Sequence, residues 1–454
     1  MNYKRYVLVF NIIFLLILIA TTMLFESNPD WAGKGIKPLD ILSEVIKDST
    51  KEKSLTEGGL KNGKSNTKKS TYVQKDYTNY NGLINTSSNP NAIFDFFKHL
   101  HDLVHKKRKK VRIAYFGDSM EEGDLVTQDL RSMLQDNYGG SGVGFVPVTS
   151  IVAGFRQTII HSFSSNWDDV NFKSDNKASC NLFISGHSFF SNANSVVTYR
   201  AVNQPRLNNF SKVSILFGSP AAGSSTDATI MANGTSYIVT AGQSVNILNL
   251  SLNNNELKLG INSNTIPLYG AAFEADTGIV VDNFAFRGIS GIELDYFTEK
   301  YLEQLQAVRP YDLLIVHYGP NLLFRPNLVD FGWYAKKMQP TLQKIRMAFP
   351  QSSVLVISTA DKGSKYDGEW HTQKGVRPLI DVQYNIARNV GADFFNLYNA
   401  MGGEDAIVRW VNAEPALANR DYTHANHNGA KKIAEMIYTA IMKEYKDYER
   451  SADK

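Results

Sequence analysis

The sequence predicts an α/β protein in which helices cover both faces of a parallel sheet, interrupted by an inserted antiparallel β-sandwich and preceded by an N-terminal transmembrane helix. Strand-like apolar runs alternate with helical patterns in two blocks, residues 89–160 and 276–447. Short strands without helices fill residues 161–275, between the two blocks. An almost unbroken apolar run occupies residues 6–25.

The composition sets limits on the protein class. A chain of 454 residues, 43% of them hydrophobic, is long enough for two or three domains. The formal net charge of +4 comes largely from two local runs, residues 51–75 and 106–110, so it does not indicate nucleic-acid binding. The single cysteine, Cys180, excludes an internal disulfide and argues against a cysteine-rich metal site.

The N-terminal apolar run predicts export of the chain. Twenty helical residues rise about 30 Å, enough to cross the core of a bilayer. Lys4 and Arg5 before the run and Glu26 after it place the amino end in the cytoplasm and the remainder outside. We expect residues 1–25 to be a membrane anchor, with a cleaved signal peptide as the alternative. Residues 26–88, rich in Lys, Ser, Thr, Asn and Gly, read as a flexible linker.

The first α/β block begins with a helix over residues 92–104 that ends in the basic cluster 106–110, where the helix dipole favours cations. A buried strand then runs up to Gly117, and a helix covers residues 125–134. The glycine-rich stretch 141–147 lacks the Lys-Ser/Thr ending of a phosphate loop. We therefore expect a tight loop with a short strand there.

The middle block alternates apolar and polar residues in short stretches separated by Asn-Gly, Asn-Asn and Gly-Ser pieces, which is typical of a sandwich. Its predicted strands are 195–201, 212–217, 228–231, 237–240, 245–250 and 257–261.

The second α/β block alternates regularly and ends in a helix that reaches about residue 445. Its predicted strands are 279–286, 313–316, 354–358 and 392–397, and its other predicted helices are 294–308, 332–349 and 377–390.

Ser119 emerges just past the end of the first predicted parallel strand, where open α/β sheets gather their ligands and catalytic groups. Taken alone, it is either a nucleophile or a helix N-cap, because Ser and Asp are favoured caps. Gly288 and Asn321 also follow predicted parallel strands, and His424 lies in the loop before the last helix. All four can meet at one edge of the sheet.

These residues supply what serine hydrolysis needs. His424 can act as the base and Asp421 as its orienting carboxylate, because three residues in a turn let both side chains point the same way. The oxyanion donors would be the Ser119 and Gly288 amides and the Asn321 side chain. Each residue also has an ordinary structural role available, as a turn, a cap or a surface histidine. Coincidence of all four in this order favours the nucleophile. The Gly-x-Ser-x-Gly elbow of α/β-hydrolases is absent from the sequence.

The pattern resembles the SGNH, or GDSL-type, hydrolase family. Gly117-Asp118-Ser119 with Gly123 matches the first motif block, and Gly288 the second. Gly319-x-Asn321 matches the third block, and Asp421-x-x-His424 the last. The resemblance implies a three-layer α/β/α, flavodoxin-like core.

Residues 116–124 and 138–146 are further similar to exported bacterial peptidoglycan O-acetylesterases that carry a carbohydrate-binding-like insertion. This resemblance implies deacetylation of an envelope glycan without a metal or organic cofactor. Two departures stand out: Leu322 replaces the Asp that many members have, and His427 lies close enough to compete with His424 as the base.

We expect an extracytoplasmic serine esterase that removes O-acyl groups from an envelope polysaccharide. The alternatives are an O-acetyltransferase with the same triad and a glycan-binding protein without activity. The predicted partners are an acylated glycan and the membrane, with a membrane O-acyltransferase as a further candidate and no nucleic acid.

Overall fold

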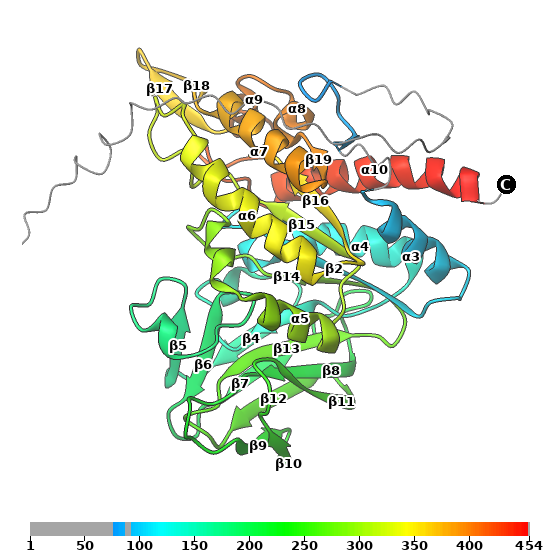
Figure 1. Ribbon diagram of the computed structural model, residues 1–454, viewed down its shortest axis with the longest axis vertical. Coiled ribbons are helices and arrows are strands. Elements are labelled where there is room, and N and C mark those ends of the chain that lie inside the picture. The colour runs from blue at the N-terminus through cyan, green and yellow to red at the C-terminus, as the bar shows by residue number, and fades with distance from the viewer. Residues whose placement is uncertain (1–75, 87–91, 453–454) are drawn as a thin grey trace, which may run out of the picture. The chain divides into compact units, whose positions relative to one another are not determined.

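The computed structural model describes residues 76–86 and 92–452 (Figure 1). The predicted anchor 1–25 and most of the predicted linker lie outside these residues. Within them, none of the helices combines the length and the apolar character that a membrane span requires.

A six-stranded sheet forms the centre of the α/β core, with the order β1-β19-β16-β15-β2-β14. The five strands from β19 to β14 are parallel, and β1 pairs antiparallel with β19 at the edge. This sheet confirms the predicted parallel arrangement. The strands are β1 (Leu83–Asn85), β2 (Lys110–Phe116), β14 (Gly278–Asn283), β15 (Leu313–His317), β16 (Ser353–Ile357) and β19 (Asp393–Phe395).

Helices cover both faces of this sheet, because successive strand residues point to opposite sides. In β2, Ile113 and Tyr115 pack in one cluster with the helices α3, α4 and α10, whereas Ala114 and Phe116 pack in the other with α5, α6 and α7. The core helices are α3 (Phe94–Val104), α4 (Leu125–Tyr138), α5 (Glu299–Val308), α6 (Gly332–Ala348), α7 (Val376–Val390), α8 (Leu397–Met401), α9 (Ala406–Val411) and α10 (His427–Ala452).

The segment between α4 and β14 forms two antiparallel sheets that pack face to face around a third apolar cluster (Figure 1). The sheet orders are β10-β9-β12-β7-β4 and β11-β8-β13-β6-β5, and β3 pairs with β13. The strands are β3 (Gly144–Pro147), β4 (Ile160–Phe163), β5 (Trp167–Asn171), β6 (His187–Ser191), β7 (Val197–Arg200), β8 (Phe210–Phe217), β9 (Asp227–Ala232), β10 (Thr235–Thr240), β11 (Asn246–Asn254), β12 (Glu256–Ile261) and β13 (Leu268–Glu274).

A buried ion network ties this sandwich to the core. Glu274, at the end of β13, lies 2.8 Å from Arg309 and 2.7 Å from Arg112. Arg309, which is 1% exposed, also contacts Asp282 of β14 at 2.6 Å. Burial alone would raise the pKa of Glu274, but these cations outweigh it and hold the pKa well below its usual value. Removing one partner would leave a buried charge unpaired, so the network fixes how the two regions meet.

The predicted linker extends too far toward the carboxyl end. Residues 76–86 pack on the core: Leu83–Asn85 form β1, and Tyr77 stacks on Tyr384 with ring centroids 3.9 Å apart. Tyr77 also donates a hydrogen bond to Asp381 at 2.8 Å. The polar composition concealed this strand, because a short edge strand needs only a few apolar side chains to pair.

Candidate active site

The structure brings the four predicted segments together at the carboxyl edge of the parallel sheet. Ser119 follows β2, Gly288 follows β14 and Asn321 follows β15, while His424 precedes α10. All four line one pocket of about 690 Å³.

The three predicted catalytic side chains form a continuous hydrogen-bonded chain. Ser119 Oγ lies 2.9 Å from Nε2 of His424, and Nδ1 of His424 lies 2.7 Å from Oδ2 of Asp421. The competing residue, His427, instead stacks on Phe155 with ring centroids 4.6 Å apart. The N-cap of α4 is Asp124, not Ser119. The geometry therefore favours Ser119 as a nucleophile over Ser119 as a helix N-cap. It also places His424 where the base of that nucleophile would lie.

The nucleophile loop is built around a close backbone approach at Gly117. A Cβ atom on Gly117 would lie 2.2 Å from Oε2 of Glu121, and the same oxygen accepts a hydrogen bond from the Asp118 amide at 3.0 Å. The side chain of Asp118 in turn accepts from the Met120 amide at 3.0 Å. Asn283 of β14 donates to the Glu121 carbonyl at 2.8 Å. These contacts fix the backbone that presents Ser119.

Three ionisable groups are buried beneath the nucleophile. Asp118 and Glu121 are fully buried, and His317 lies 2.8 Å from Glu121. Burial, with a further contribution from the Glu121 charge, raises the pKa of Asp118 to about 7. Burial alone would lower the pKa of His317, but the Glu121 carboxylate outweighs it and raises that pKa. This cluster touches the backbone around Ser119 and does not reach the base.

The base loop holds its carboxylate through backbone donors. Oδ1 of Asp421 accepts hydrogen bonds from the Thr423 and His424 amides, each at 3.0 Å. Burial alone would raise the pKa of Asp421, but these bonds and the His424 imidazole lower it. Asp421 is therefore ionised at neutral pH and accepts the Nδ1 proton of His424, leaving Nε2 as the acceptor facing Ser119.

A β-hairpin supports this loop from outside the sheet. Its strands are β17 (Gly363–Tyr366) and β18 (Glu369–Thr372). Trp370 stacks on Tyr422 with ring centroids 3.9 Å apart, and the Gly363 amide donates to the Tyr422 carbonyl at 2.8 Å. Tyr422 has a positive φ of 54°, so these contacts hold a backbone conformation that is uncommon for a bulky residue.

Two of the predicted oxyanion donors are backbone amides. Among the described residues, the amides of Ser119 and Gly288 donate no hydrogen bond. Gly288 has a φ of 78°, and a Cβ atom there would lie 2.7 Å from Nζ of Lys173. A glycine is therefore favoured by both the backbone and the available space.

The third predicted donor, Asn321, faces the pocket with its amide already engaged. Its Nδ2 donates to Oδ2 of Asp118 at 3.1 Å and to the Ile289 carbonyl at 2.8 Å. To stabilise an oxyanion, this amide has to give up one of these bonds. Lys362 fixes the surrounding turn by donating to the carbonyls of Pro320 at 3.0 Å and Leu323 at 2.8 Å.

Several residues that shape the site were not identified from the sequence. Arg287 contacts Glu122 at 2.7 Å and so joins the nucleophile loop to the Gly288 loop. Leu322, by contrast, was singled out in the sequence, and it is buried in the core. Lys362, Trp370 and the Arg287–Glu122 pair lie outside the matched motifs, and only their folded positions indicate a role.

The arrangement can support nucleophilic attack on an ester carbonyl. A half-buried serine contacts the imidazole of His424, and a carboxylate orients that imidazole. Two backbone amides that donate no other hydrogen bond within the described residues lie nearby. Among the described residues, no group of three or more His, Cys, Asp or Glu side chains is placed to hold a metal ion.

Comparisons with known proteins agree with this fold. No model of a known protein family matches the sequence, and no curated protein matches it. A solved structure described as "Peptidoglycan O-acetylesterase in action, 5 min" matches with a TM-score of 0.66 and 20% sequence identity, covering 80% of this chain and 99% of that chain.

Two acetylxylan esterase structures also match, over a smaller part of the chain. The esterase AlAXEase has a TM-score of 0.28 and 18% identity, covering 36% of this chain and 81% of its own. Axe2 from Geobacillus stearothermophilus has a TM-score of 0.28 and 18% identity, covering 37% and 74%. The TM-scores of these two esterases are too low to support a conclusion. The match to the peptidoglycan O-acetylesterase structure confirms the expected resemblance at the level of the fold: the described part of the chain is folded like that protein.

Proposed function

We propose that the chain is a serine esterase that removes O-acetyl groups from a cell-envelope polysaccharide such as peptidoglycan. The observation that carries this proposal is the chain of contacts Ser119–His424–Asp421 at the wall of an open pocket. The fold likeness to a peptidoglycan O-acetylesterase supports the choice of an O-acetylated glycan as substrate.

The reaction proceeds through an acyl-enzyme. Ser119 Oγ attacks the acetyl carbonyl while His424 Nε2 accepts its proton, and the Ser119 and Gly288 amides stabilise the oxyanion that develops. The sugar oxygen then leaves with the proton from His424. Water attacks the acetyl-serine, again with His424 as base, and releases acetate.

Water access favours hydrolysis over acetyl transfer. The side chains of His424 and Asp421 are 36% and 49% exposed, so solvent reaches the base directly. An O-acetyltransferase needs to keep water from the acyl-enzyme, and this half-exposed pair does not do so. Incubation of the full chain with an acyl donor and glycan, followed by mass analysis, tests the choice: acetate added to the glycan would contradict it.

Labelling with a fluorophosphonate probe tests the triad. The full chain, kept in mild detergent because of its apolar first 25 residues, is expected to be labelled, and Ser119→Ala is expected to lose the label. Ser224→Ala, at a half-buried serine of the sandwich, serves as the matched control and should be labelled like the unaltered chain. Equal labelling of Ser119→Ala and the control would exclude Ser119 as the nucleophile, whereas no labelling of the unaltered chain would leave a glycan-binding role.

The location proposed for the enzyme is outside the cytoplasm, anchored by residues 1–25. The apolar run over residues 6–25, which Lys4 and Arg5 precede, supports this location. A membrane O-acyltransferase that installs the ester would then act on the same polymer at the same side of the membrane. Protease treatment of intact spheroplasts tests this: digestion of the catalytic part is expected, and full protection would contradict it.

A further inference from the structure

A lysine of the inserted sandwich contacts the loop that carries the Gly288 amide. Lys173 follows β5 by two residues, and its Nζ donates a hydrogen bond to the Arg287 carbonyl at 2.8 Å. That carbonyl and the Gly288 amide belong to the same peptide group. A Cβ atom on Gly288 would lie 2.7 Å from the same Nζ, so the ammonium also packs closely against Gly288. The sandwich therefore touches the Gly288 loop at the peptide that the proposed reaction uses.

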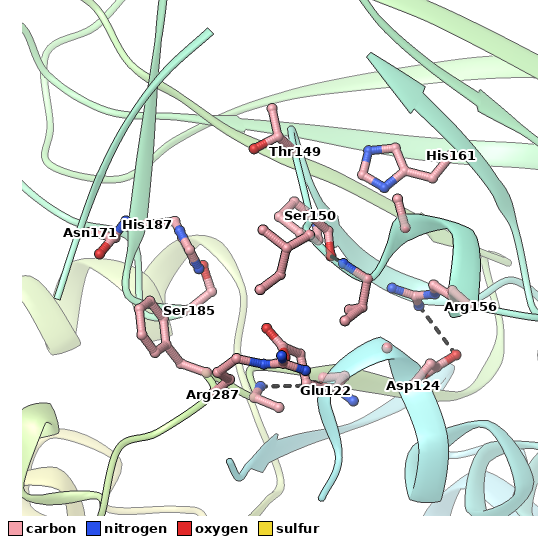
Figure 2. A pocket seen from close by; sticks show the side chains of 18 of the residues that line it. Glu122, Asp124, Thr149, Ser150, Arg156, His161, Asn171, Ser185, His187 and Arg287 are labelled. Carbon is pink, nitrogen blue, oxygen red and sulfur yellow. Dashed lines mark hydrogen bonds and ion pairs between the residues drawn. The ribbon is translucent and has the colours of Figure 1, made fainter. Parts of the chain in front are cut away.

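The two sides of this peptide face different spaces. Lys173 lines a cavity of about 240 Å³, whereas Gly288 lines the pocket of about 690 Å³ that contains Ser119, and Arg287 lines both. Figure 2 shows the smaller cavity, with the ion pair between Arg287 and Glu122 at its wall. The C=O and N–H of a trans peptide point in opposite directions. A carbonyl held on the cavity side therefore keeps the amide N–H on the side of the catalytic pocket.

Lys173 is the hydrogen-bond partner that fixes the direction of this peptide. Among the described residues, the Arg287 carbonyl accepts from Lys173 alone, and the Gly288 amide donates to no acceptor. The preceding Phe286 amide, by contrast, is held by the Gly117 carbonyl at 3.1 Å. A half-turn of the peptide plane would move φ of Gly288 from 78° to a negative value, and glycine adopts both about equally well. Without Lys173, the backbone leaves the direction of the Gly288 amide open.

Lys173 is exposed, but its surroundings fix where the ammonium lies. The Lys173 amide donates to Oδ1 of Asn171 at 3.0 Å, and the Ser174 amide donates to the Asn171 carbonyl at 2.9 Å, which closes a tight turn. The ammonium lies 5.6 Å from the centroid of the Phe286 ring, within the range of a cation–π contact. Phe286 packs against Phe172 of the sandwich, with ring centroids 5.4 Å apart. The turn and the two rings together hold the ammonium beside residues 286–288.

The charge of Lys173 acts on the peptide without a competing anion. Among the described residues, no carboxylate pairs with its ammonium, whereas the Arg287 side chain pairs with Glu122 at 2.7 Å. A hydrogen bond from a charged donor is stronger than one from a neutral donor, and linked hydrogen bonds polarise one another. An ammonium on the Arg287 carbonyl therefore makes the Gly288 N–H a stronger donor. Such a preorganised donor is most effective where negative charge develops in the transition state.

We propose that Lys173 is a positioning residue for the oxyanion hole: it holds and polarises the Arg287–Gly288 peptide so that the Gly288 amide faces the oxyanion that develops at Ser119. The inference rests on the proposed function and deepens it, because it makes the inserted sandwich part of the catalytic apparatus. In this role Lys173 does not touch the substrate. It acts on the chemical step through Gly288 and leaves the hydrogen bond between Ser119 and His424 unchanged.

Substitution of Lys173 in the full chain, kept in mild detergent, tests this role kinetically. Lys173→Met keeps an unbranched side chain and removes the donor, whereas Lys173→Arg keeps a charged donor. Loss of a whole oxyanion donor costs about 10²- to 10³-fold in kcat. Lys173→Met leaves the amide in place but frees its direction, so kcat for p-nitrophenyl acetate should fall about 10- to 100-fold while KM changes less than about threefold. Lys173→Arg should recover most of the lost rate. Lys258→Met, at an exposed lysine of β12 that lines neither space, is the matched control and should react like the unaltered chain.

An oxyanion analogue separates this role from a purely structural one. Methylboronic acid binds Ser119 Oγ as a tetrahedral boronate, the hydroxyl proton passes to His424, and a boronate oxygen occupies the oxyanion hole. Its affinity, titrated calorimetrically, should fall in Lys173→Met by about the same factor as kcat/KM and recover in Lys173→Arg, because the analogue resembles the transition state. The thermal midpoints of both variants should stay near that of Lys258→Met.

Three results would overturn the inference. The first is a Lys173→Met variant that keeps the kcat and the boronate affinity of Lys258→Met. The second is a Lys173→Arg variant as impaired as Lys173→Met, and the third is a set of losses that follow a lowered thermal midpoint. Absence of p-nitrophenyl acetate hydrolysis in the unaltered chain would instead refute the esterase, and the boronate titrations would still decide the role of Lys173. If the unaltered chain does not bind the boronate, the inference is also overturned, because a positioned oxyanion hole binds such an adduct.

Discussion

The loop that carries the nucleophile and the loop that carries the base each contain an aspartate, and the two aspartates lie in opposite surroundings. Asp118, next to Ser119, is fully buried, and its pKa is raised to about 7. Asp421, three residues before His424, is half-exposed, and backbone donors lower its pKa. The carboxylate next to the nucleophile in sequence therefore shapes the backbone, whereas the carboxylate that orients the base is ionised, hydrogen-bonded and partly solvated.

Substitution of the nucleophile or the base is expected to have the largest effect, and it should separate His424 from His427 at the start of α10. His424→Ala and Ser119→Ala should each lower kcat for p-nitrophenyl acetate about 10⁴- to 10⁶-fold, as loss of a triad member does in serine hydrolases. His427→Ala should lower it less than about 10-fold, because His427 packs on Phe155 and does not contact Ser119. Steady-state kinetics measures both. Comparable losses for His424→Ala and His427→Ala would overturn the assignment of the base.

Substitution of the two aspartates is expected to have the next largest effect on kcat. Asp421→Asn should lower kcat about 10⁴-fold, because an amide no longer selects the His424 tautomer with a proton on Nδ1. Asp118→Asn should cost about 100-fold or less, since it disturbs only the position of the Ser119 loop. The thermal midpoint of Asp421→Asn should stay near that of the unaltered chain. A larger loss in Asp118→Asn than in Asp421→Asn would reverse the comparison.

The raised pKa of Asp118 predicts a pH-dependent stability. Between about pH 4 and pH 7 the unfolded chain releases this proton while the folded chain keeps it, so the free energy of unfolding falls as the pH rises through this window. Three pKa units correspond to about 4 kcal/mol as an upper bound. Asp118→Asn cannot ionise and should lose this component of the slope. Thermal unfolding of both proteins from pH 4.5 to pH 8 measures the difference, and parallel curves would contradict the raised pKa.

Removal of the contact between the β17–β18 hairpin and the base loop is expected to have the smallest effect on activity. Trp370→Ala removes the stacking on Tyr422 and should lower the free energy of unfolding by about 1 kcal/mol. The base loop then samples other positions, and kcat should fall about 3- to 10-fold. Lys365→Ala is a suitable control on the same hairpin, because it removes the cation 5.5 Å above the Trp370 ring and leaves the stacking on Tyr422 in place. Equal activity of Trp370→Ala and the unaltered chain would mean that Asp421 and its backbone donors hold the loop alone.

Much of the core could be predicted because its signals are local. The alternation of strands and helices in residues 276–447 is confirmed, with α6 and α7 within a residue of their predicted bounds, since helical and strand periodicities are visible along the chain. The helix predicted at residue 294 begins at Glu299, after a 3-10 turn at Ile292–Tyr296. Strands β4, β5, β6 and β13 and the β17–β18 hairpin were missed, because cross-strand pairing that stabilises such stretches comes from distant residues.

At the site, the residues that reach the carboxyl edge of the sheet could be identified from the chain alone, because all strands of a parallel sheet end at the same edge. Ser119, Gly288 and Asn321 follow from that rule, whereas His424 was expected at the same edge from its loop before the last helix. The spacing to Asp421 already favoured His424 over His427, and the folded backbone agrees because it aims His424 at Ser119. Only the tertiary structure decided that Asn321 bonds to Asp118 and that a second cavity, of about 240 Å³, shares lining residues with the pocket at Ser119. Contacts and cavities arise where surfaces from distant segments meet, and no local pattern encodes that meeting.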